Sequence, residues 1–530
     1  MSAVNALVPH DPRTRGPHPD PETPAAIPAG IPAEAVTRED PRYQHLVARA
    51  RNTRFTGRPD TVHLVHSTEQ VRQAVQHSVA AGQRLAVRSG GHGLDNLVDD
   101  PAVRALVDLS AMDAVGYDRA REAFSVQSGA LLGPTYRSLY LDFGVALPGG
   151  TCPSVGLGGY VQGGGFGPMC RSHGLIVDHL YGIEVVTVDA SGRARAVVAT
   201  REPDDPNREL WWAHTGAGGG NFGIVTRYWF RSPHADGRDP RSALPRPPRT
   251  VLTGSASWSW EDLDEADFTR IVDNHGAWHA HDEQDGDGGY DTLYSGLYLN
   301  QRAVGQVTLT AQIDGDLPDA RERLAGYFAA VGQGVRARCR TRFAAMPWLD
   351  SVQRDVENRG EQTRSKSKGA YLRRPYGPAQ TATLFRYLQD PADRSHTVVL
   401  LFSYGRAVNR VAPHATAAPQ RDSILKSYLG TYWVDPAEDE RHLARNRAFY
   451  RDLYAATGGV PAPGTATDGS YVNYPDTDLA DPRWNTSGIP WHALYFKDNY
   501  PRLQRAKDRW DPLDTFRHAL SIRPTTATGH

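Results

Sequence analysis

A single histidine, His92, lies among glycines in the segment Arg88-Ser-Gly-Gly-His-Gly93, directly after a strand-like pattern. Glycines leave their amide N–H groups uncovered, and successive uncovered amides form a concavity that holds an anion such as a pyrophosphate. A lone histidine is more often structural or solvated than reactive. Its position in a glycine nest at the end of a strand supports a functional role about as well as a structural one.

Cys152 lies in a second glycine-rich segment, residues 148–167, with the sequence PGGTCPSVGLGGYVQGGGFG. A free cysteine is usually a small buried hydrophobic residue. Here Pro153 and the flanking glycines leave little side-chain volume to bury the thiol. An accessible thiol beside an electron-poor ring can become a covalent attachment point. The remaining cysteines, Cys170 and Cys339, supply neither the pairs of a disulfide framework nor the spacing of a zinc site.

A third glycine cluster, Gly218–Gly223, matches the dinucleotide-binding fingerprint by letter. That fingerprint requires a strand before it and a helix after it, and here the order is reversed, which disfavours a Rossmann site. Two interpretations remain open in equal measure. The glycines either form a turn that needs positive φ angles, or they let the backbone approach a ligand.

Three histidines and an aspartate, His275, His279, His281 and Asp282, have the spacing of ligands on one helical face. The segment continues into DEQDGDGG, which is polar and rich in glycine. We therefore expect a solvated helix end here and no metal site.

Hydrophobic periodicity predicts the elements that position these residues, among them a helix over 69–81, strands over 85–91 and 397–405, and a long helix over 436–457. Residues 1–38 contain many prolines and little periodicity, which is typical of a disordered tail. The segment 234–250 is rich in proline and arginine, the composition of an exposed connection. The pattern favours two domains that meet near residue 235.

Composition narrows the class of protein. The chain has 59 basic and 60 acidic residues and a formal net charge of −1, which argues against an extended nucleic-acid surface. It contains no apolar run long enough to span a membrane, and its start lacks the pattern of a secretory signal. We expect a cytoplasmic protein, a monomer or homodimer, with no membrane or nucleic-acid partner.

Five motifs in order resemble the FAD-linked oxidases of the vanillyl-alcohol-oxidase type, and within them the berberine-bridge-enzyme-like group. RSGGHG (88–93) resembles the histidyl attachment loop of that group, and PGGTC (148–152) with the following glycines resembles the cysteinyl loop. The segments near 217–226 and 471–476 resemble those that close over the flavin, and the terminal DPLDTFRHALSIRP completes the series. Bacterial hexose oxidases, glycopeptide-sugar oxidases and antibiotic-tailoring oxidases have the closest patterns.

The resemblance implies an α+β fold. The FAD-binding domain would be formed by 39–235 and by 466–530, which returns to it, and 236–465 would form a substrate domain with an antiparallel sheet covered by helices. His92 would bond the 8α-methyl carbon of the flavin and Cys152 its C6. The remaining contacts with the cofactor would come from Arg88, Ser89, Gly90, Gly91, Gly93, Gly149, Gly150, Thr151, Val155, Gly156, Gly159, Gly163, Gly223, Ile224, Val225 and Asn473.

The resemblance also implies oxidation of an alcohol carbon of a sugar or glycosylated natural product, with O₂ reduced to H₂O₂. A tyrosine of the motif Tyr471-Val-Asn-Tyr474 would be the base, and we favour Tyr474 over Tyr471. A phenol near pKa ~10 can act as a base only if its neighbours stabilise the anion. The alternative is that these tyrosines are packing residues.

The candidate substrate contacts are Phe166, Leu401 and Tyr404, with Phe402 beside them. Some relatives have tyrosine where this chain has Phe166, so a hydroxyl contact is missing here. Dehydrogenation or oxidative cyclisation of a metabolite other than a sugar stays open, as does a flavin-binding protein without turnover. A nicotinamide dehydrogenase is the third alternative, and it would lack a tightly held yellow chromophore.

Overall fold

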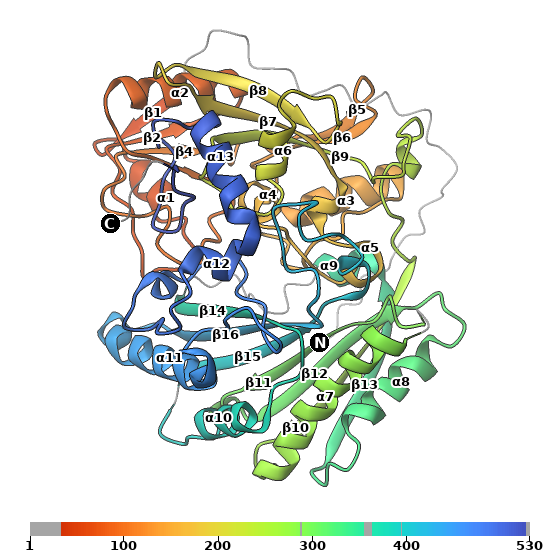
Figure 1. The fold of residues 1–530 in the computed structure, drawn as a ribbon. Helices are drawn as coiled ribbons and strands as arrows, with labels where there is room; N and C mark the ends of the chain where they lie inside the picture. The colour runs from red at the N-terminus through yellow and green to blue at the C-terminus, as the bar shows by residue number, and fades with distance from the viewer. Residues whose placement is uncertain (1–32, 287–288, 354–362, 394, 526–530) are drawn as a thin grey trace, which may run out of the picture.

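Three β-sheets form the framework of this protein, seen in a computed structural model that describes residues 33–286, 289–353, 363–393 and 395–525 (Figure 1). The first sheet has the strand order β1-β2-β4-β3, in which β2, β4 and β3 run parallel and β1 is antiparallel. Its strands are β1 (Glu34–Thr37), β2 (Thr61–Leu64), β3 (Leu85–Arg88) and β4 (Ala105–Asp108). Helix α2 (Thr68–Ala80) packs against it through Val71, Ala74 and Val75.

The second sheet is antiparallel, with the order β5-β6-β9-β7-β8. Its strands are β5 (Val115–Asp118), β6 (Ala123–Gln127), β7 (Leu180–Val188), β8 (Ala194–Thr200) and β9 (Ile224–Phe230). Two of the glycine-rich segments lie in the connections of this sheet, 148–167 between β6 and β7 and Gly218–Gly223 before β9, whereas the segment 88–93 follows β3 of the first sheet. The same connections contain the helices α3 (Leu132–Phe143), α4 (Leu157–Gln162), α5 (Cys170–His173) and α6 (Arg208–Ala213).

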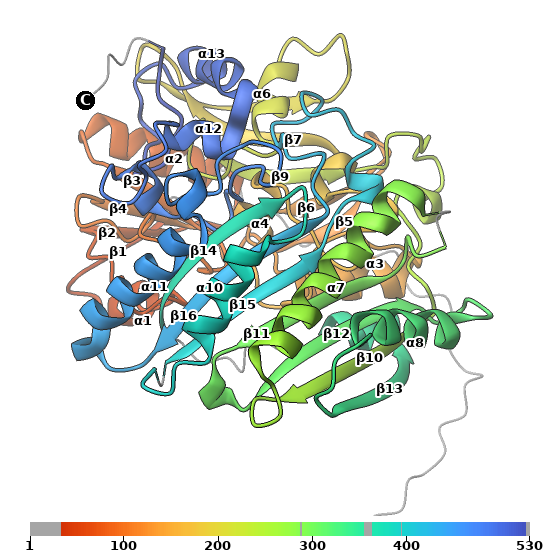
Figure 2. The same ribbon diagram turned by 60° about the horizontal axis from the view of Figure 1, so that its bottom comes forward.

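The third sheet has seven antiparallel strands in the order β13-β10-β12-β11-β15-β16-β14. Its strands are β10 (Thr250–Ser259), β11 (Tyr294–Asn300), β12 (Gln306–Asp314), β13 (Cys339–Pro347), β14 (Arg364–Leu372), β15 (His396–Ser403) and β16 (Leu425–Trp433). The helices α7 (Glu265–Asp285), α8 (Ala320–Val331), α10 (Pro378–Leu388) and α11 (Asp439–Leu453) cover its outer face (Figure 2). The opposite face is turned toward the N-terminal part of the molecule.

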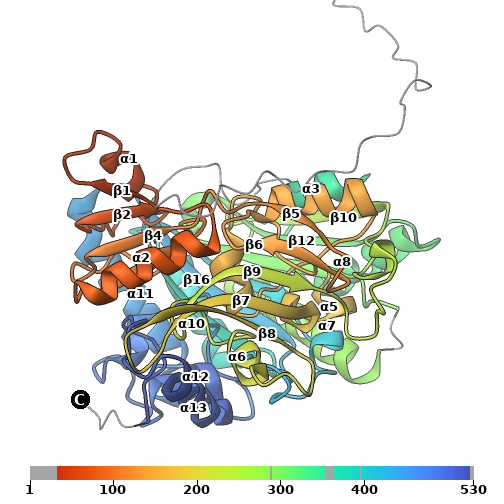
Figure 3. The same ribbon diagram turned by 90° about the horizontal axis from the view of Figure 1, so that it is seen from above.

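The C-terminal segment returns to the N-terminal part, where α12 (Trp491–Phe496) and α13 (Tyr500–Trp510) lie near α6 (Figure 3). Arg502 forms an ion pair of 2.6 Å with Glu209, and the Lys507 ammonium donates to the Asn221 carbonyl at 2.8 Å. This return confirms the predicted α+β fold, with one part built from both ends of the chain and the other from a helix-covered antiparallel sheet. In the part of the chain that the structure describes, no helix is long and apolar enough to span a membrane.

Most of the predicted elements are confirmed with shifted ends. The helix expected over 69–81 is α2, which begins after Ser67, whose side chain accepts a hydrogen bond from the Gln70 N–H. The prediction of a disordered tail was wrong for Glu34–Thr37, because these residues pair with β2 as strand β1. The rest of that predicted tail, residues 1–32, lies outside the described residues.

The expectation of a solvated helix end was wrong for His275, His279 and Asp282 of α7, whereas His281 is exposed. His275 and His279 are fully buried, and Asp282 is buried in an ion pair with Arg171. His275 lies 3.0 Å from the Tyr327 hydroxyl and His279 lies 3.1 Å from Ser295. Among the residues that the structure describes, no group of acidic, histidine or cysteine side chains is arranged to hold a metal ion.

The burial of His275 makes the stability of the protein depend on pH. Burial lowers its pKa from 6.5 to about 3, so below pH 6.5 the unfolded chain binds a proton that the folded chain excludes. Stability is therefore lost as the pH falls from 6.5 toward 3, by about 1.4 kcal/mol per pH unit for this residue. We expect His275→Gln to reduce the loss in unfolding free energy between pH 7 and pH 5, measured by urea denaturation. The control is the same substitution at His281, an exposed residue of the same helix, which should leave the pH dependence of the unfolding free energy unchanged. Equal pH dependence in wild type and His275→Gln would contradict this account.

Candidate active site

A cavity of about 1130 Å³ lies between the N-terminal part and the inner face of the seven-stranded sheet. All three glycine-rich segments identified in the sequence reach it, and so does the tyrosine motif at 471–474. The cavity therefore has one wall made of backbone and another made of the side chains of a sheet.

His92 and Cys152 meet at this cavity although they are distant in sequence. His92 Nε2 lies 3.1 Å from the Ser154 hydroxyl, and Cys152 Sγ lies 3.5 Å from the same oxygen. Both residues are partly exposed and both line the cavity. Burial, with a smaller contribution from Arg51, lowers the pKa of His92 to about 4, so its imidazole is neutral at pH 7. A neutral imidazole and a thiol thus face one space, where a single ring system can reach both.

The two loops that carry these residues touch through their backbones. A Cβ atom at Gly90 would lie 2.4 Å from the Gly156 nitrogen, and one at Gly156 would lie 2.3 Å from the Gly90 nitrogen. Gly91 has a φ of 75°, which favours glycine. The glycines are thus required for the close approach, and the bare backbone they leave fits a cofactor with a pyrophosphate group.

Most of the predicted cofactor contacts line the cavity. They are Arg88, Ser89, Gly90, Gly91, Gly93, Gly150, Thr151, Val155, Gly156, Gly159, Gly223, Ile224, Val225 and Asn473. Gly149 and Gly163 do not line it and have supporting positions. A Cβ at Gly149 would meet the Tyr136 hydroxyl at 2.4 Å, and one at Gly163 would overlap the Asn473 side chain.

The two tyrosines of the 471–474 motif have different surroundings. The Tyr471 hydroxyl donates to the Gly164 carbonyl at 3.2 Å and accepts from the Asn473 amide at 2.9 Å, and burial raises the pKa of Tyr471. Tyr474 is partly exposed in the cavity, and its ring lies edge to face against Tyr471 at 4.9 Å. Both tyrosines line the cavity, but Tyr471 is buried with two hydrogen-bond partners for its hydroxyl, and Tyr474 is the more exposed of the two.

Strand β15 shows which side chains of the sheet reach the cavity. Val398, Leu400 and Phe402 line it, whereas Ser403 lies 3.4 Å from His279 on the helix-covered side. Because side chains alternate along a strand, Leu401 faces the helices. The structure therefore does not bring Leu401 to the site, and its neighbour Phe402 stands there instead.

Phe166 lines the cavity, and Tyr404 stands behind it. The Tyr404 ring is buried 6.2 Å from that of Phe166, and its hydroxyl donates to the Gln420 carbonyl at 3.3 Å. The Lys426 ammonium packs between the aromatic rings, 3.7 Å from the centre of Phe166 and 3.3 Å from that of Tyr471. The structure thus gives Tyr404 a supporting position and no contact with the cavity.

Sequence reasoning missed several residues that line the cavity. On the sheet these include Tyr294, Tyr298, His396, Tyr428 and Tyr432, and on the C-terminal segment they include Arg517 and His518. His518 Nε2 lies 3.1 Å from the Gly219 carbonyl, which ties the third glycine cluster to the end of the chain. For Tyr428 and Tyr432 the available signal was their even spacing in LKSYLGTYW, which places both on one face of β16.

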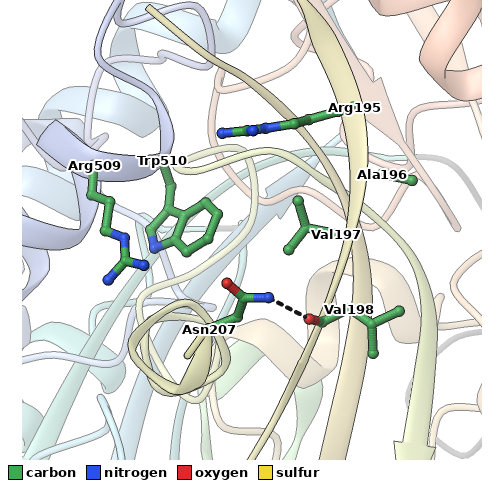
Figure 4. Close-up of a pocket in the computed structure, with 7 residues that line it drawn as sticks. All are labelled: Arg195, Ala196, Val197, Val198, Asn207, Arg509 and Trp510. Carbon is green, nitrogen blue, oxygen red and sulfur yellow. Dashed lines mark hydrogen bonds between the residues drawn. The ribbon is translucent and has the colours of Figure 1, made fainter. Parts of the chain in front are cut away.

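A second, smaller cavity of about 540 Å³ lies along strand β8. Arg509 and Trp510, from the end of α13, line it opposite Val197 and Val198, and Asn207 donates to the Val198 carbonyl at 3.0 Å (Figure 4). It contains neither a nucleophile nor an acid–base pair from the motifs above, so the larger cavity is the candidate active site.

Two sequence families match this chain. The family described as "FAD binding domain" matches residues 59–196, and the family described as "Berberine and berberine like" matches residues 470–523. The first range includes His92 and Cys152. The second includes the tyrosine motif and the C-terminal return.

Known proteins match nearly the full chain. Aclacinomycin-N/aclacinomycin-A oxidase of Streptomyces galilaeus is 55% identical over 92% of this chain and 89% of its own length. Hexose oxidase of Chondrus crispus is 30% identical over 94% of this chain and 96% of its own. The crystal structure of glycopeptide hexose oxidase DBV29 complexed with teicoplanin has a TM-score of 0.90 and 44% identity, and covers 93% of this chain and 99% of that one.

Proposed function

This chain belongs to the berberine-bridge-enzyme-like family of FAD-linked oxidases, and from that membership and the geometry of the cavity we propose that it oxidises an alcohol carbon of a sugar or glycosylated natural product. The FAD would be attached through both His92 and Cys152. The observation that carries the proposal is that both residues lie within 3.5 Å of the Ser154 hydroxyl, beside the wall of the cavity that is formed by glycine backbone.

When bound, FAD supplies the acceptor for the hydride of the alcohol carbon and passes its electrons to O₂, which yields H₂O₂. The residues of the chain would hold the cofactor and orient the substrate. The loops around Gly90 and Gly156 would receive the pyrophosphate, and Asn473 would contact the ring system. The glycosylated end of the substrate would lie against the aromatic side chains of β11, β15 and β16.

Tyr474 would accept the proton of the substrate hydroxyl. It is the more exposed of the two tyrosines that line the cavity, whereas Tyr471 is buried and holds Asn473 and the Gly164 carbonyl. A positioned base contributes about 10²–10⁴-fold to proton transfer. Tyr471 and Asn473 would therefore be positioning residues.

Peroxide release tests the reaction. Aclacinomycin A, free hexoses and the glycopeptide teicoplanin are the first compounds to assay, because the names of the relatives point to them. Peroxide formation and bleaching of the flavin with any of them would support the proposal. A flavin that stays oxidised with all three classes would contradict it and favour a flavin-binding protein without turnover.

Intact mass and flavin spectra after denaturation test the two tethers. We expect the wild-type chain to retain the mass of one FAD, and His92→Ala and Cys152→Ala each to retain it through the remaining bond. The double variant should release all of its flavin on denaturation. Cys170→Ala is the matched control, since Cys170 is a buried thiol outside the cavity. Wild-type flavin that separates from the denatured chain would contradict covalent attachment.

A further inference from the structure

Three hydroxyl groups form a string on the cavity face of the seven-stranded sheet. Ser367 Oγ of β14 lies 2.7 Å from the Tyr428 hydroxyl of β16, which lies 2.7 Å from the Tyr432 hydroxyl. Both tyrosines line the cavity, and Ser367 and Tyr428 are buried. The Tyr428 oxygen therefore has a hydroxyl partner on each side.

A glycine makes this string possible. Gly430 lies midway between Tyr428 and Tyr432 on the same face of β16 and pairs with Ser367 across the strands. A Cβ at Gly430 would lie 2.6 Å from Cε1 of Tyr428 and 2.9 Å from Cε2 of Tyr432. The two rings thus converge over a position that any other side chain would fill.

The string begins next to the proposed base and ends near the rim of the cavity. The Tyr428 ring lies edge to face against Tyr474 with centroids 4.8 Å apart. At the other end the Tyr432 ring is only partly buried and lies 5.8 Å from that of His396, an exposed residue that also lines the cavity. The three hydroxyl groups thus extend from the ring neighbour of Tyr474 to a partly exposed residue near the rim of the cavity.

We propose that Ser367, Tyr428 and Tyr432 form the proton outlet of Tyr474, an inference that rests on the function proposed above. The substrate O–H bond would break and its proton would bond to the Tyr474 oxygen, while the hydride would leave the alcohol carbon for the acceptor that bound FAD supplies, and that carbon would become a carbonyl. Tyr474 is readied for this step by giving its own proton to Tyr428. Tyr428 gives one to Tyr432, and Tyr432 gives one to water at the rim.

Each transfer leaves a phenolate that the string stabilises. A phenol with pKa ~10 loses its proton readily only when donors stabilise the anion. A Tyr428 phenolate would accept hydrogen bonds from both Ser367 and Tyr432, and hydrogen bonds to a charged acceptor are about twice as strong as neutral ones. This arrangement lowers the cost of removing a proton from the base between turnovers.

A similar group of hydroxyls on the other face of β16 provides the control. The Tyr376 hydroxyl lies 2.8 Å from Ser427 and 3.0 Å from the Tyr454 hydroxyl. All three are buried, and none lines the cavity. Tyr376→Phe therefore removes a phenol hydroxyl from a serine–tyrosine–tyrosine group that cannot exchange protons with Tyr474.

Anaerobic stopped-flow reduction of the holoenzyme flavin tests the outlet. We expect Tyr428→Phe to lower the limiting reduction rate by about tenfold or more, with the substrate dissociation constant within about twofold of wild type. Tyr376→Phe should keep the wild-type rate. Weaker substrate binding at an unchanged limiting rate would overturn the proposal and make the string a substrate subsite. Equal losses in both variants would also overturn it.

A second measurement needs no substrate. With 3-fluorotyrosine at position 428 of the holoenzyme, ¹⁹F NMR reports the pKa of that phenol. We expect Ser367→Ala to raise this pKa, because one donor to the phenolate is lost. An unchanged pKa would overturn the string even if the enzyme turns over. Failure of the proposed function would instead appear as a wild-type flavin that none of the three compound classes reduces.

Discussion

Tyr474→Phe lowers the limiting rate of flavin reduction by about 10²–10⁴-fold, the range expected when a positioned general base is removed. The phenyl ring keeps the edge-to-face contacts with Tyr471 and Tyr428, so the loss reports the hydroxyl and not the packing. The measurement is anaerobic stopped-flow reduction at saturating substrate, with the flavin content of each variant determined first.

Tyr471→Phe distinguishes the two candidates for the base. We expect it to lower the rate less than Tyr474→Phe does, because its main effect is to free the Asn473 amide and the Gly164 carbonyl, which now hold its hydroxyl. If the larger loss is found in Tyr471→Phe, then Tyr471 is the base and the assignment of Tyr474 is wrong.

Lys368→Met lowers the free energy of unfolding by about 3–5 kcal/mol, because it removes one of the cations that neutralise a group of buried carboxylates. Lys368 lies 2.6 Å from Asp476 and 2.8 Å from Asp478, and all three side chains are buried. Lys366 adds an ion pair of 2.7 Å with Asp476, and Arg447 one of 2.8 Å with Asp478. Methionine keeps an unbranched chain about as long as the apolar part of lysine and removes the ammonium group, with its charge and its hydrogen bonds to Asp476 and Asp478.

The control for this variant is an exposed pair of the same chemistry. Arg483 lies 2.5 Å from Asp481, but its side chain is 81% exposed, so Arg483→Met should cost far less than Lys368→Met. Urea denaturation of the two variants compares the costs directly. Similar values for Lys368→Met and Arg483→Met would show that the buried charges add little to stability.

The same charges connect two functional loops. Asp95, three residues after His92, accepts hydrogen bonds from the Thr477 N–H at 2.9 Å and from the Thr477 hydroxyl at 3.0 Å. Burial opposes the charge on Lys366, but Asp476, Asp95 and Asp478 outweigh it and raise the Lys366 pKa. The cluster thus holds the loop of a proposed tether against the loop of the proposed base.

The glycine motifs predicted much of the backbone wall of the cavity, because close backbone approach has a sequence signature that does not depend on distant partners. His92 and Cys152 each lie in such a motif, and the ordered motifs supplied the rest. Their meeting at Ser154 was not predictable from spacing, since it depends on the backbone contact between Gly90 and Gly156.

The sheet side was harder to predict. A strand buried on both faces reads as a continuous apolar run, so the pattern around Leu401 did not reveal which of its side chains face the cavity. The prediction for His275 and His279 of α7 was wrong for a related reason. Their polar neighbours in sequence indicated solvent, but their neighbours in space are Tyr327 and Ser295 of the core.

The meeting of His92 and Cys152 has a consequence for the folding of the chain. A cofactor bonded to both residues closes a covalent ring of about 60 residues, which spans the first glycine loop, strands β4 to β6 and helix α3. Crosslinks of this length remove conformational entropy from the unfolded chain worth about 4 kcal/mol at 25 °C. The attached flavin would then stabilise the native state as a crosslink as well as serve as a redox group, and the apoprotein would be the more easily unfolded form.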